Sequence, residues 1–500
     1  MHWLLSLLQI LADIRADSNR DGRVDLDGDI DIPHKLNHLD HAGAIFLANI
    51  GDTDRRCSKL ALNGSPPSNE KLAACNDASD NIQRSPQYMA PLRTVPISCL
   101  SPSAYGTVSV EDATLQQGLN LGLDARDTRR PGGWDGRVTV RFTVHDRGKM
   151  SADSVKLRVA PILTYHHSHS VHQILTTEGN NTFNLFQAKF VSAFDAALAE
   201  MNVNSPLFKF NASDDIWAQN FFEPGYTSMP SPDGPVTLRI MIRSAQDSRV
   251  AGRQVFEYLR AAGTGAVQHL GGARDEVNSM GNLETIPPHS FKGKKYKKPY
   301  ILEYLQAQEI QDPLLVDVDW LAVGHVDEML QFLPANNSLG WVMLVPDPQE
   351  GLAILRHAQS AGHGKTGAFS RQNDTEGNPS DLFGIPWGLR GVPSYTIDEL
   401  LLQNELIEAN ANFSERIKAT VDVLKCKTGI KDADNTHERS GSHKYARSLY
   451  PATINGLVLS DTEYLAPNPW DPVINGRDIM ADAVSKVYGG LGFKVSFVDD

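Results

Sequence analysis

The sequence has few cysteines, no excess of positive charge and no long hydrophobic run. No stretch approaches the roughly 20 apolar residues that a membrane-spanning helix needs. Asp and Glu number 60 against 47 Lys and Arg, for a net charge of −13, so no dominant basic surface is available to neutralise a nucleic-acid backbone. A cationic substrate or metal ions suit this charge better. The apolar fraction of 41% and the charged fraction of 21% exclude a collagen-like, coiled-coil or mostly disordered chain.

The cysteines stand at positions 57, 75, 99 and 426 and form no C-x-x-C pair, which argues against a zinc site or a redox centre of that type. If the chain is secreted, this even number allows two disulfides, and Cys57–Cys75 is the pair to test first.

The compartment is left open by the sequence. Residues 3–12 (WLLSLLQILA) form a short apolar run of the kind found in a signal-peptide core, but the usual positive segment before it is missing. A gene model that begins inside a buried strand or helix explains the run equally well. Sequons lean slightly toward secretion, with a cytoplasmic location as the alternative; they begin at Asn63, Asn180, Asn211, Asn336, Asn373 and Asn412.

The first 160 residues are typical of β-structure. Val138, Val140, Phe142 and Val144 alternate with polar residues, which predicts a half-buried strand, and the region shows no helical segment. This pattern predicts a β-sandwich over residues 1–162.

The pattern changes near residue 163. Predicted helices at 186–201 and 396–417 alternate with apolar strand-like runs at 236–242, 314–318, 341–345 and 493–498. This alternation predicts an α/β or α+β domain over residues 163–500, and no repeat of 20 to 50 residues is visible in the sequence.

One short segment has the residue pattern of a calcium-binding loop. Oxygen-bearing side chains alternate along it and Gly22 follows for a tight turn, an arrangement that wraps a hard cation such as Ca²⁺. Gly28 stands where an EF-hand has its bidentate Glu, so the loop would be of another kind. A turn without an ion is the alternative. The predicted ligands are Asp17, Asn19, Asp21 and Asp25.

A second acidic cluster follows in the same region. Carboxylates that are close together repel one another unless a cation lies among them, so this cluster also predicts a calcium site that stabilises the first domain. Its members are Asn49, Asp52, Asp54, Asp77 and Asp80.

The densest group of reactive residues in the second domain lies at 319–328 (DWLAVGHVDE). His325 precedes Asp327 by two positions, so both side chains share one face if the backbone is extended. Such a pair can bind a cationic group and move protons, although a His that is hydrogen-bonded near a strand end is the structural alternative. Residues 214–223 (DDIWAQNFFE) add acidic and aromatic groups, with a half-buried strand as their alternative.

These motifs together resemble the protein-arginine deiminases. WLAVGHVDE, DDIWAQN-x-x-E-x-GY, GNLE-x-x-PP and DPVINGR carry the resemblance, and ADSNRDGRVD and GAIFLANIGDTD resemble that family's calcium-binding middle domain. The resemblance runs from about residue 13 to 500. It implies an immunoglobulin-like β-sandwich over residues 1–162, followed by a pentein, the five-bladed α/β propeller of guanidine-modifying enzymes.

The resemblance also implies a reaction. In the family, a cysteine thiolate attacks the guanidinium carbon of an arginine in a protein or peptide, and citrulline and ammonia are released with calcium required. Matched by motif, His325 is the acid/base and Asp327 one guanidinium-binding carboxylate. Trp217 is implied to pack against the substrate stem, and Arg249 to orient the peptide backbone. The implied calcium ligands near the active site are Gln219 and Glu223.

Two departures from the family put activity in doubt. Asn220 occupies the catalytic position of the second guanidinium-binding Asp, and a hydrogen bond to a charged group is worth about 1.5–3 kcal/mol. The family's nucleophilic Cys falls beyond the segment that matches residues 490–500, and none of the four cysteines matches it. The chain as written is therefore expected to be inactive. The alternative function is a non-catalytic pentein that binds arginine-containing peptides or is a calcium-stabilised scaffold. A deiminase for free arginine or agmatine fits less well, because those enzymes generally lack the calcium-binding β-domain.

Overall fold

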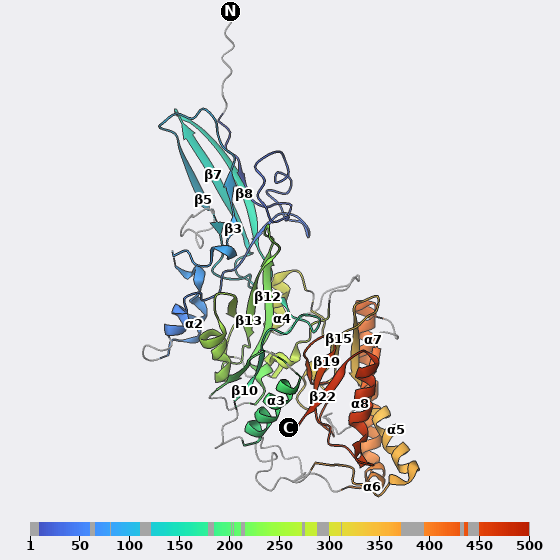
Figure 1. Ribbon diagram of the computed structural model, residues 1–500. Helices are drawn as coiled ribbons and strands as arrows, with labels where there is room; N and C mark the ends of the chain where they lie inside the picture. Colours follow the sequence, from blue (N-terminus) through green and yellow to red (C-terminus); the bar gives the residue numbers. More distant parts are fainter. Residues whose placement is uncertain are drawn as a thin grey trace, which may run out of the picture.

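The computed structural model has a long sheet at one end and a group of helices at the other (Figure 1). The apolar run at 3–12 lies almost wholly outside the described residues, as do Asp214 and Asp215 of the predicted site segment. The residues described are 10–60, 66–80, 82–110, 122–178, 185–201, 203, 205–211, 216–272, 276–287, 300–311, 313–371, 395–430, 435–438 and 450–499.

A four-stranded sheet forms most of the N-terminal part. The strands are antiparallel except for β2 and β8, which are parallel. The predicted alternation is confirmed, because Val138, Val140 and Val144 are buried while Phe142 is partly buried against the same core. Arg147 and Gly148 turn the chain between β7 and β8 with φ of 50° and 72°, the twist that a tight hairpin needs. The order is β2 (Ala44–Phe46), β8 (Lys149–Val159), β7 (Arg137–Asp146) and β5 (Tyr105–Val110).

Short elements complete this part. Two antiparallel pairs are β1 (Ile14–Arg15) with β4 (Arg93–Thr94) and β3 (Ala90–Pro91) with β6 (Gly122–Leu123). The expectation that this region lacks helical segments is wrong, because it contains the short helices α1 (Arg56–Leu60) and α2 (Asn69–Ala74). The immunoglobulin-like arrangement of these sheets stays a prediction.

A disulfide joins Cys57 in α1 to Cys75, which follows α2. The pair predicted from the sequence is therefore confirmed. Cys99 and Cys426 are free and exposed.

The C-terminal part repeats one strand pattern in three of its sheets. In each unit two antiparallel strands are followed by a helical connection and a third strand, which pairs in parallel with the second strand. The units are β12 (Phe222–Met229), β13 (Val236–Arg243) and β14 (Thr264–Gln268); β15 (Gln331–Pro334), β16 (Trp341–Pro346) and β17 (Asn435–Glu438); β18 (Leu457–Val458), β19 (Glu463–Pro467) and β22 (Lys494–Val498).

Other strands extend this arrangement. β9 (Leu163–Thr164) pairs with β12, and β10 (Ile174–Thr177) lies parallel to β11 (Leu207–Phe210), with α3 (Leu185–Glu200) between them in the chain. A small hairpin joins β20 (Val473–Ile474) to β21 (Arg477–Asp478). Parallel and antiparallel pairs are thus mixed, and none of the sheets within the described ranges closes into a barrel.

The helices confirm one prediction and correct another. The helix predicted at 186–201 is α3. The single helix predicted at 396–417 is two helices, because the chain breaks at Leu402 and Gln403 and a second helix then continues to Gly429, whose φ of 77° ends it. The helices after α3 are α4 (Tyr300–Gln308), α5 (Pro348–Ala358), α6 (Ile397–Leu401), α7 (Asn404–Thr428) and α8 (Ile479–Gly490).

The strand predicted at 314–318 is wrong. This segment pairs with no strand among the described residues. Leu314, Val316 and Val318 instead pack, partly buried, against the hydrophobic core that contains Trp320 and Phe413. The alternation of apolar residues in this segment therefore reflects side-chain packing against the core and not pairing with a neighbouring strand.

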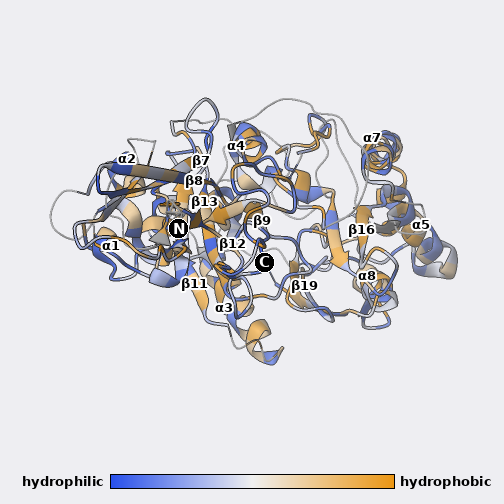
Figure 2. Cartoon of the chain, turned by 90° about the horizontal axis from the view of Figure 1, so that it is seen from above, coloured by the Kyte–Doolittle hydropathy of each residue, from blue (hydrophilic) through white to orange (hydrophobic). Residues whose placement is uncertain are grey.

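One hydrophobic core crosses the predicted domain boundary. It contains Val140 and Leu157 from the N-terminal sheet together with Ile240 and Tyr304 from the C-terminal part. The boundary between residues 162 and 163 therefore remains a prediction. Hydrophobic strands fill the interior while α7 presents both hydrophilic and hydrophobic residues (Figure 2). None of the described helices is long and apolar enough to cross a membrane.

Candidate active site

Three short 3-10 helices bring the predicted catalytic residues together. They are η4 (Ala218–Asn220), η8 (Met280–Asn282) and η9 (Val326–Glu328). η4 comes directly before β12 and η9 shortly before β15, so two of the repeated units each place one catalytic segment at the start of their first strand. η8 packs between them in contact with both.

His325 and Asp327 both face the backbone of Gly281. A Cβ atom at Gly281 would lie 2.7 Å from Nδ1 of His325 and 2.8 Å from Oδ2 of Asp327, so only glycine fits there. Both side chains are buried, and a hydrogen bond of 3.0 Å from the His325 N–H to Oε1 of Glu328 fixes the turn. The side chains of His325 and Asp327 therefore lie together, as the sequence predicted. Their segment is a 3-10 turn, however, and not an extended strand.

Each of these side chains keeps one reactive atom without a hydrogen-bond partner among the described residues. The atoms are Nε2 of His325 and Oδ1 of Asp327. Buried polar atoms are usually paired, so these two are the positions at which a bound ligand would complete the site.

Arg249 is linked to His325 by Glu276, a residue that the sequence analysis did not select. Its Nη2 donates to both carboxylate oxygens of Glu276 at 2.9 Å, and its Nε donates to Oε1 of Gln246 at 2.6 Å. Oε2 of Glu276 lies 3.7 Å from Nε2 of His325. His325, followed by Arg249, holds the pKa of Glu276 below its ordinary value. No feature of the sequence near Glu276 distinguishes it from a surface acid.

Asn220 is buried at the end of η4, and its Oδ1 accepts a hydrogen bond from the hydroxyl of Ser279. Trp217 precedes this helix and is half exposed, at 49%. An exposed indole beside a buried polar centre is a surface on which an aliphatic chain can pack. Ser279 was also missed, because a serine before a GNLE motif carries no signal of its own.

Three carboxylates line a cavity of about 400 Å³ beside this centre. Burial is the main cause that raises the pKa of Asp327 to about 7. Burial, followed by the charges of Glu284 and Asp327, raises the pKa of Glu223 well above its ordinary value. Burial and the charge of Asp327 do the same to the pKa of Glu284. Gln219 lines the same cavity, which is therefore suited to a cation. Glu284 was quoted only as part of a motif, and the structure places it with the predicted ligand Glu223.

The predicted loop at Asp17–Asp25 is closed by its own hydrogen bonds. Asp17 accepts from the N–H groups of Asp21 at 3.1 Å and Gly22 at 2.9 Å, and Asn19 donates to Asp21 at 2.9 Å. Burial, opposed by the bond from Gly22, is the main cause that raises the pKa of Asp17 to about 6. The N–H of Asp25 donates to Oδ2 of the buried Asp31 at 2.7 Å. Asp31 was missed by the sequence analysis.

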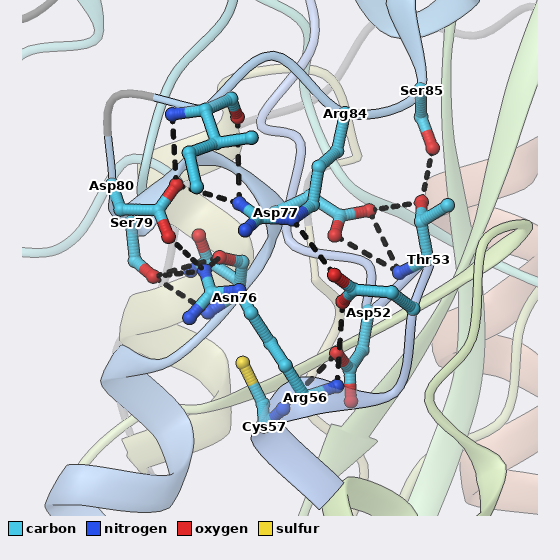
Figure 3. A network of polar contacts seen from close by, with 12 residues as sticks. Asp52, Thr53, Arg56, Cys57, Asn76, Asp77, Ser79, Asp80, Arg84 and Ser85 are labelled. Atoms are coloured by element: carbon cyan, nitrogen blue, oxygen red, sulfur yellow. Dashed lines mark hydrogen bonds and ion pairs between the residues drawn. The ribbon is translucent and has the colours of Figure 1, made fainter.

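The structure brings three carboxylates of the second predicted cluster close together. Ligand oxygens of Asp52, Asp54 and Asp77 all lie within 4.8 Å of one another, which is a group that could hold a metal ion. Figure 3 shows Asp52 and Asp77 within one polar network. Asn49 is buried nearby: its Nδ2 donates to Asp124 at 3.0 Å, and its Oδ1 has no hydrogen-bond partner in the described part of the chain. Oxygen donors and an unpaired buried oxygen fit a hard cation such as Ca²⁺.

Comparison with known proteins identifies the family of this chain. The sequence model of the family "Protein-arginine deiminase (PAD)" matches residues 149–500. The chain belongs to the protein-arginine deiminase family. Membership implies a pentein catalytic domain, and the repeated strand units of the C-terminal part are compatible with one.

Individual members of the family are similar over part of their length. The chain is 29% identical to protein-arginine deiminase type-3 of Homo sapiens over 313 residues, which is 57% of this chain and 44% of the relative. It is 27% identical to the type-4 enzyme of Homo sapiens over 315 residues, with the same two shares. For the human type-1 enzyme the identity is 26% over 405 residues, 73% of this chain and 56% of the relative. The chain spans about half the length of the curated relatives it matches.

Proposed function

We propose that this chain binds peptidyl-arginine in the site around His325 and Asp327, and that its reaction is the hydrolysis of peptidyl-arginine to peptidyl-citrulline and ammonia. The observation that carries the proposal is the buried Oδ1 of Asp327, which has no hydrogen-bond partner in the described part of the chain and lies in one site with His325, in a member of this family. Nε2 of His325 has Glu276 as its nearest charged group, at 3.7 Å. A guanidinium group stays charged at all physiological pH values and presents donors in a planar fork, so an ionised Asp327 is a suitable partner.

Each residue has a defined role in this proposal. Asp327 holds the guanidinium, and His325 gives a proton to the departing ammonia and then takes one from the attacking water. Trp217 packs against the aliphatic stem of the arginine. Arg249, held by Glu276, donates to the peptide backbone of the substrate.

The described site contains no cysteine that could be the nucleophile. Cys57 and Cys75 form a disulfide, and neither Cys99 nor Cys426 is among the residues that line the cavity. Without a thiolate beside the guanidinium carbon, the covalent intermediate has no first step. We therefore propose that the chain as given binds substrate but does not turn it over.

The second candidate function is a non-catalytic pentein that binds arginine-containing peptides or is a calcium-stabilised scaffold. The neutral Asn220 favours it, because one of the family's two ionic partners for the guanidinium is replaced by an amide. Two measurements on the full chain with calcium test these functions. Citrulline production from an arginine peptide shows turnover and overturns our proposal that the chain as given is inactive. Binding of the arginine peptide without citrulline production supports the assigned site, which an inactive deiminase chain and an arginine-peptide-binding pentein share; absence of both overturns that site and leaves the calcium-stabilised scaffold.

Calcium is the proposed cofactor. Asp52, Asp54 and Asp77, with Asn49 beside them, would hold one ion, and the Asp17–Asp25 loop another. Gln219, Glu223 and Glu284 would hold an ion at the cavity. A bound Ca²⁺ neutralises carboxylates that otherwise repel one another or stay protonated. The test is the melting temperature at millimolar CaCl₂ against MgCl₂ and a chelator, since a ligand that binds only the folded state raises it; no calcium-dependent rise would refute the assignment.

The finer fold is part of the proposal. We infer an immunoglobulin-like domain over residues 1–162 and a five-bladed propeller over residues 163–500. Three sheets with the same strand pattern, and the related pair β10–β11, support the propeller. An experimental structure in which these units do not surround a common axis would overturn it.

A further inference from the structure

The Cys57–Cys75 disulfide lies directly beside the acidic cluster of Asp52, Asp54 and Asp77. The N–H of Cys57 donates to Oδ1 of Asp52 at 3.2 Å. Asp77 follows Cys75 by two residues, and its Oδ1 accepts from the N–H of Thr53 at 2.9 Å. The disulfide therefore connects the two chain segments that supply the carboxylates, one before α1 and one after α2. Figure 3 shows Cys57, Asp52 and Asp77 in this arrangement.

Outside the disulfide, these two segments are held together mainly by polar contacts. Arg56, next to Cys57, donates to the carbonyl oxygen of Asn76 at 2.5 Å and to Oγ of Ser79 at 2.8 Å. Its Nη1 also contacts Sγ of Cys75 at 3.4 Å. The N–H of Asp77 also donates to the carbonyl oxygen of Gly51 at 2.9 Å. Each such hydrogen bond has a net worth of about 0.5–1.5 kcal/mol, so a covalent link adds to the contacts that set the relative position of the segments.

Asp52 has little freedom of its own. Its Oδ2 accepts from the N–H of Ser58 at 3.0 Å and from the hydroxyl of Ser58 at 2.8 Å, so α1 fixes the direction of this carboxylate. Arg260 from the C-terminal part donates to the carbonyl oxygens of Leu72 at 3.0 Å and Cys75 at 2.5 Å, which fixes the end of α2. The disulfide joins α1, which orients Asp52, to Cys75 at the end of α2.

We propose that the Cys57–Cys75 disulfide sets the cation affinity of the Asp52–Asp54–Asp77 cluster, so that a divalent cation such as Ca²⁺ binds tightly in the oxidised protein and weakly in the reduced one. The inference rests on the proposed calcium site. Arg84 already pairs with Asp54, with its Nε 3.2 Å from Oδ2. Bringing the carboxylates of Asp52 and Asp77 to the same place still costs ordering entropy and Coulomb energy before a bound cation can compensate for it. Closing the loop between the two cysteines, which are 18 positions apart, removes part of that entropy in advance.

The redox step is an ordinary thiol–disulfide exchange. A dithiol reductant such as dithiothreitol supplies two electrons and two protons, the S–S bond breaks, Cys57 and Cys75 become thiols, and the reductant becomes its cyclic disulfide. Because coupling between two sites is reciprocal, a bound cation shifts this equilibrium toward the disulfide by the same factor by which the disulfide raises cation affinity.

The first test is calorimetric titration of the full chain with CaCl₂. The double variant Cys57→Ser/Cys75→Ser is compared with Cys99→Ser/Cys426→Ser, which replaces the same number of cysteines but at exposed positions outside the disulfide. We expect the first variant to bind calcium about tenfold or more weakly at the affected site, and the second to behave like the parent. In an Asp77→Asn background the difference between the two cysteine variants should disappear, which assigns the effect to this cluster.

The second test does not need the variant to fold. The parent protein is equilibrated in mixtures of reduced and oxidised dithiothreitol with CaCl₂ or with a chelator, alkylated, and the thiols of Cys57 and Cys75 are counted by mass spectrometry. We expect calcium to shift the midpoint toward the disulfide by about tenfold or more in the ratio of reductant to oxidant. MgCl₂ at the same ionic strength is the control for salt effects.

The outcomes separate the two proposals. If calcium binds but neither its affinity nor the thiol–disulfide equilibrium changes, the redox coupling is overturned and the calcium site stands. If no calcium binds in either redox state, both are overturned.

Discussion

Nε2 of His325 lies 3.7 Å from Oε2 of Glu276, the same carboxylate that accepts two hydrogen bonds from Arg249. Glu276 therefore connects two residues that the sequence suggested for different roles, the acid/base and the substrate-orienting arginine. Glu276 is half exposed, at 49%, whereas His325 is buried, so the contact joins the surface to the buried centre.

Asp327→Asn should weaken binding of an arginine peptide about tenfold to hundredfold at pH 8, because it removes the charge that pairs with the guanidinium. With a pKa of about 7, Asp327 is mostly protonated below that pH and ionised above it. Affinity in the parent should therefore rise between pH 6 and 8, and this rise should flatten in the variant. Calorimetry with an arginine peptide measures both; Asp319→Asn, at an exposed position, is the matched control.

Asn220→Asp should strengthen binding of the same peptide about tenfold, since it adds a second ionic partner of the kind worth about 1.5–3 kcal/mol. The hydroxyl of Ser279 can donate to a carboxylate as it does to the amide, so the local hydrogen bond is kept. Asn404→Asp, at an exposed position in α7, adds the same charge away from the site and should have no effect. Unchanged or weaker binding in Asn220→Asp would show that this position does not face the guanidinium.

Gly281→Ala should abolish peptide binding, because the new methyl group would lie 2.7 Å from Nδ1 of His325 and 2.8 Å from Oδ2 of Asp327. Overpacking of this kind costs about 1–3 kcal/mol of folding stability, so the chain should still fold. Gly489→Ala in α8 meets no atom within 4 Å and serves as the control. Binding by a folded Gly281→Ala variant at the parent's affinity would contradict the geometry of the site.

The stability of the protein should fall in acid through Glu309, which joins the two parts of the chain. Its carboxylate lies 2.6 Å from Arg129 and 3.2 Å from Arg158, and Arg129 is the main cause that lowers the pKa of Glu309 to about 2. A lowered carboxyl pKa gives stability that is present above the unfolded value near 4.5 and is lost as the pH falls toward 2. Urea unfolding between pH 6 and 3 should therefore show a smaller loss in Glu309→Gln than in the parent.

The control for this experiment is Glu408→Gln, an exposed carboxyl group on α7. It should keep the parent's dependence on pH. If Glu309→Gln and the parent lose the same stability between pH 6 and 3, the ion pairs of Glu309 do not contribute to folding. Its contribution should also shrink at high salt, because the carboxylate is partly exposed.

Local patterns in the sequence were sufficient for several elements and for the family. Alternation at period two predicted β7, and helical periodicity predicted α3, because each pattern reflects which face of one element is buried. His325 and Asp327 could be selected because they are two positions apart in the chain and carry complementary chemistry. The segment at 314–318 shows the limit of this reasoning: the same alternation occurs there without a strand partner.

Only the tertiary structure decided which residues surround His325 and Asp327. Glu276, Ser279, Gly281 and Glu284 come from one earlier segment of the chain, residues 276–284, and their contacts depend on how η8 packs between η4 and η9. The repeated strand units were invisible in the sequence for a related reason: their connections differ in length, and hydrogen bonds between strands leave no periodic signal. Sequence patterns record local burial and chemistry, whereas the site is made by contacts between segments that are distant in the chain.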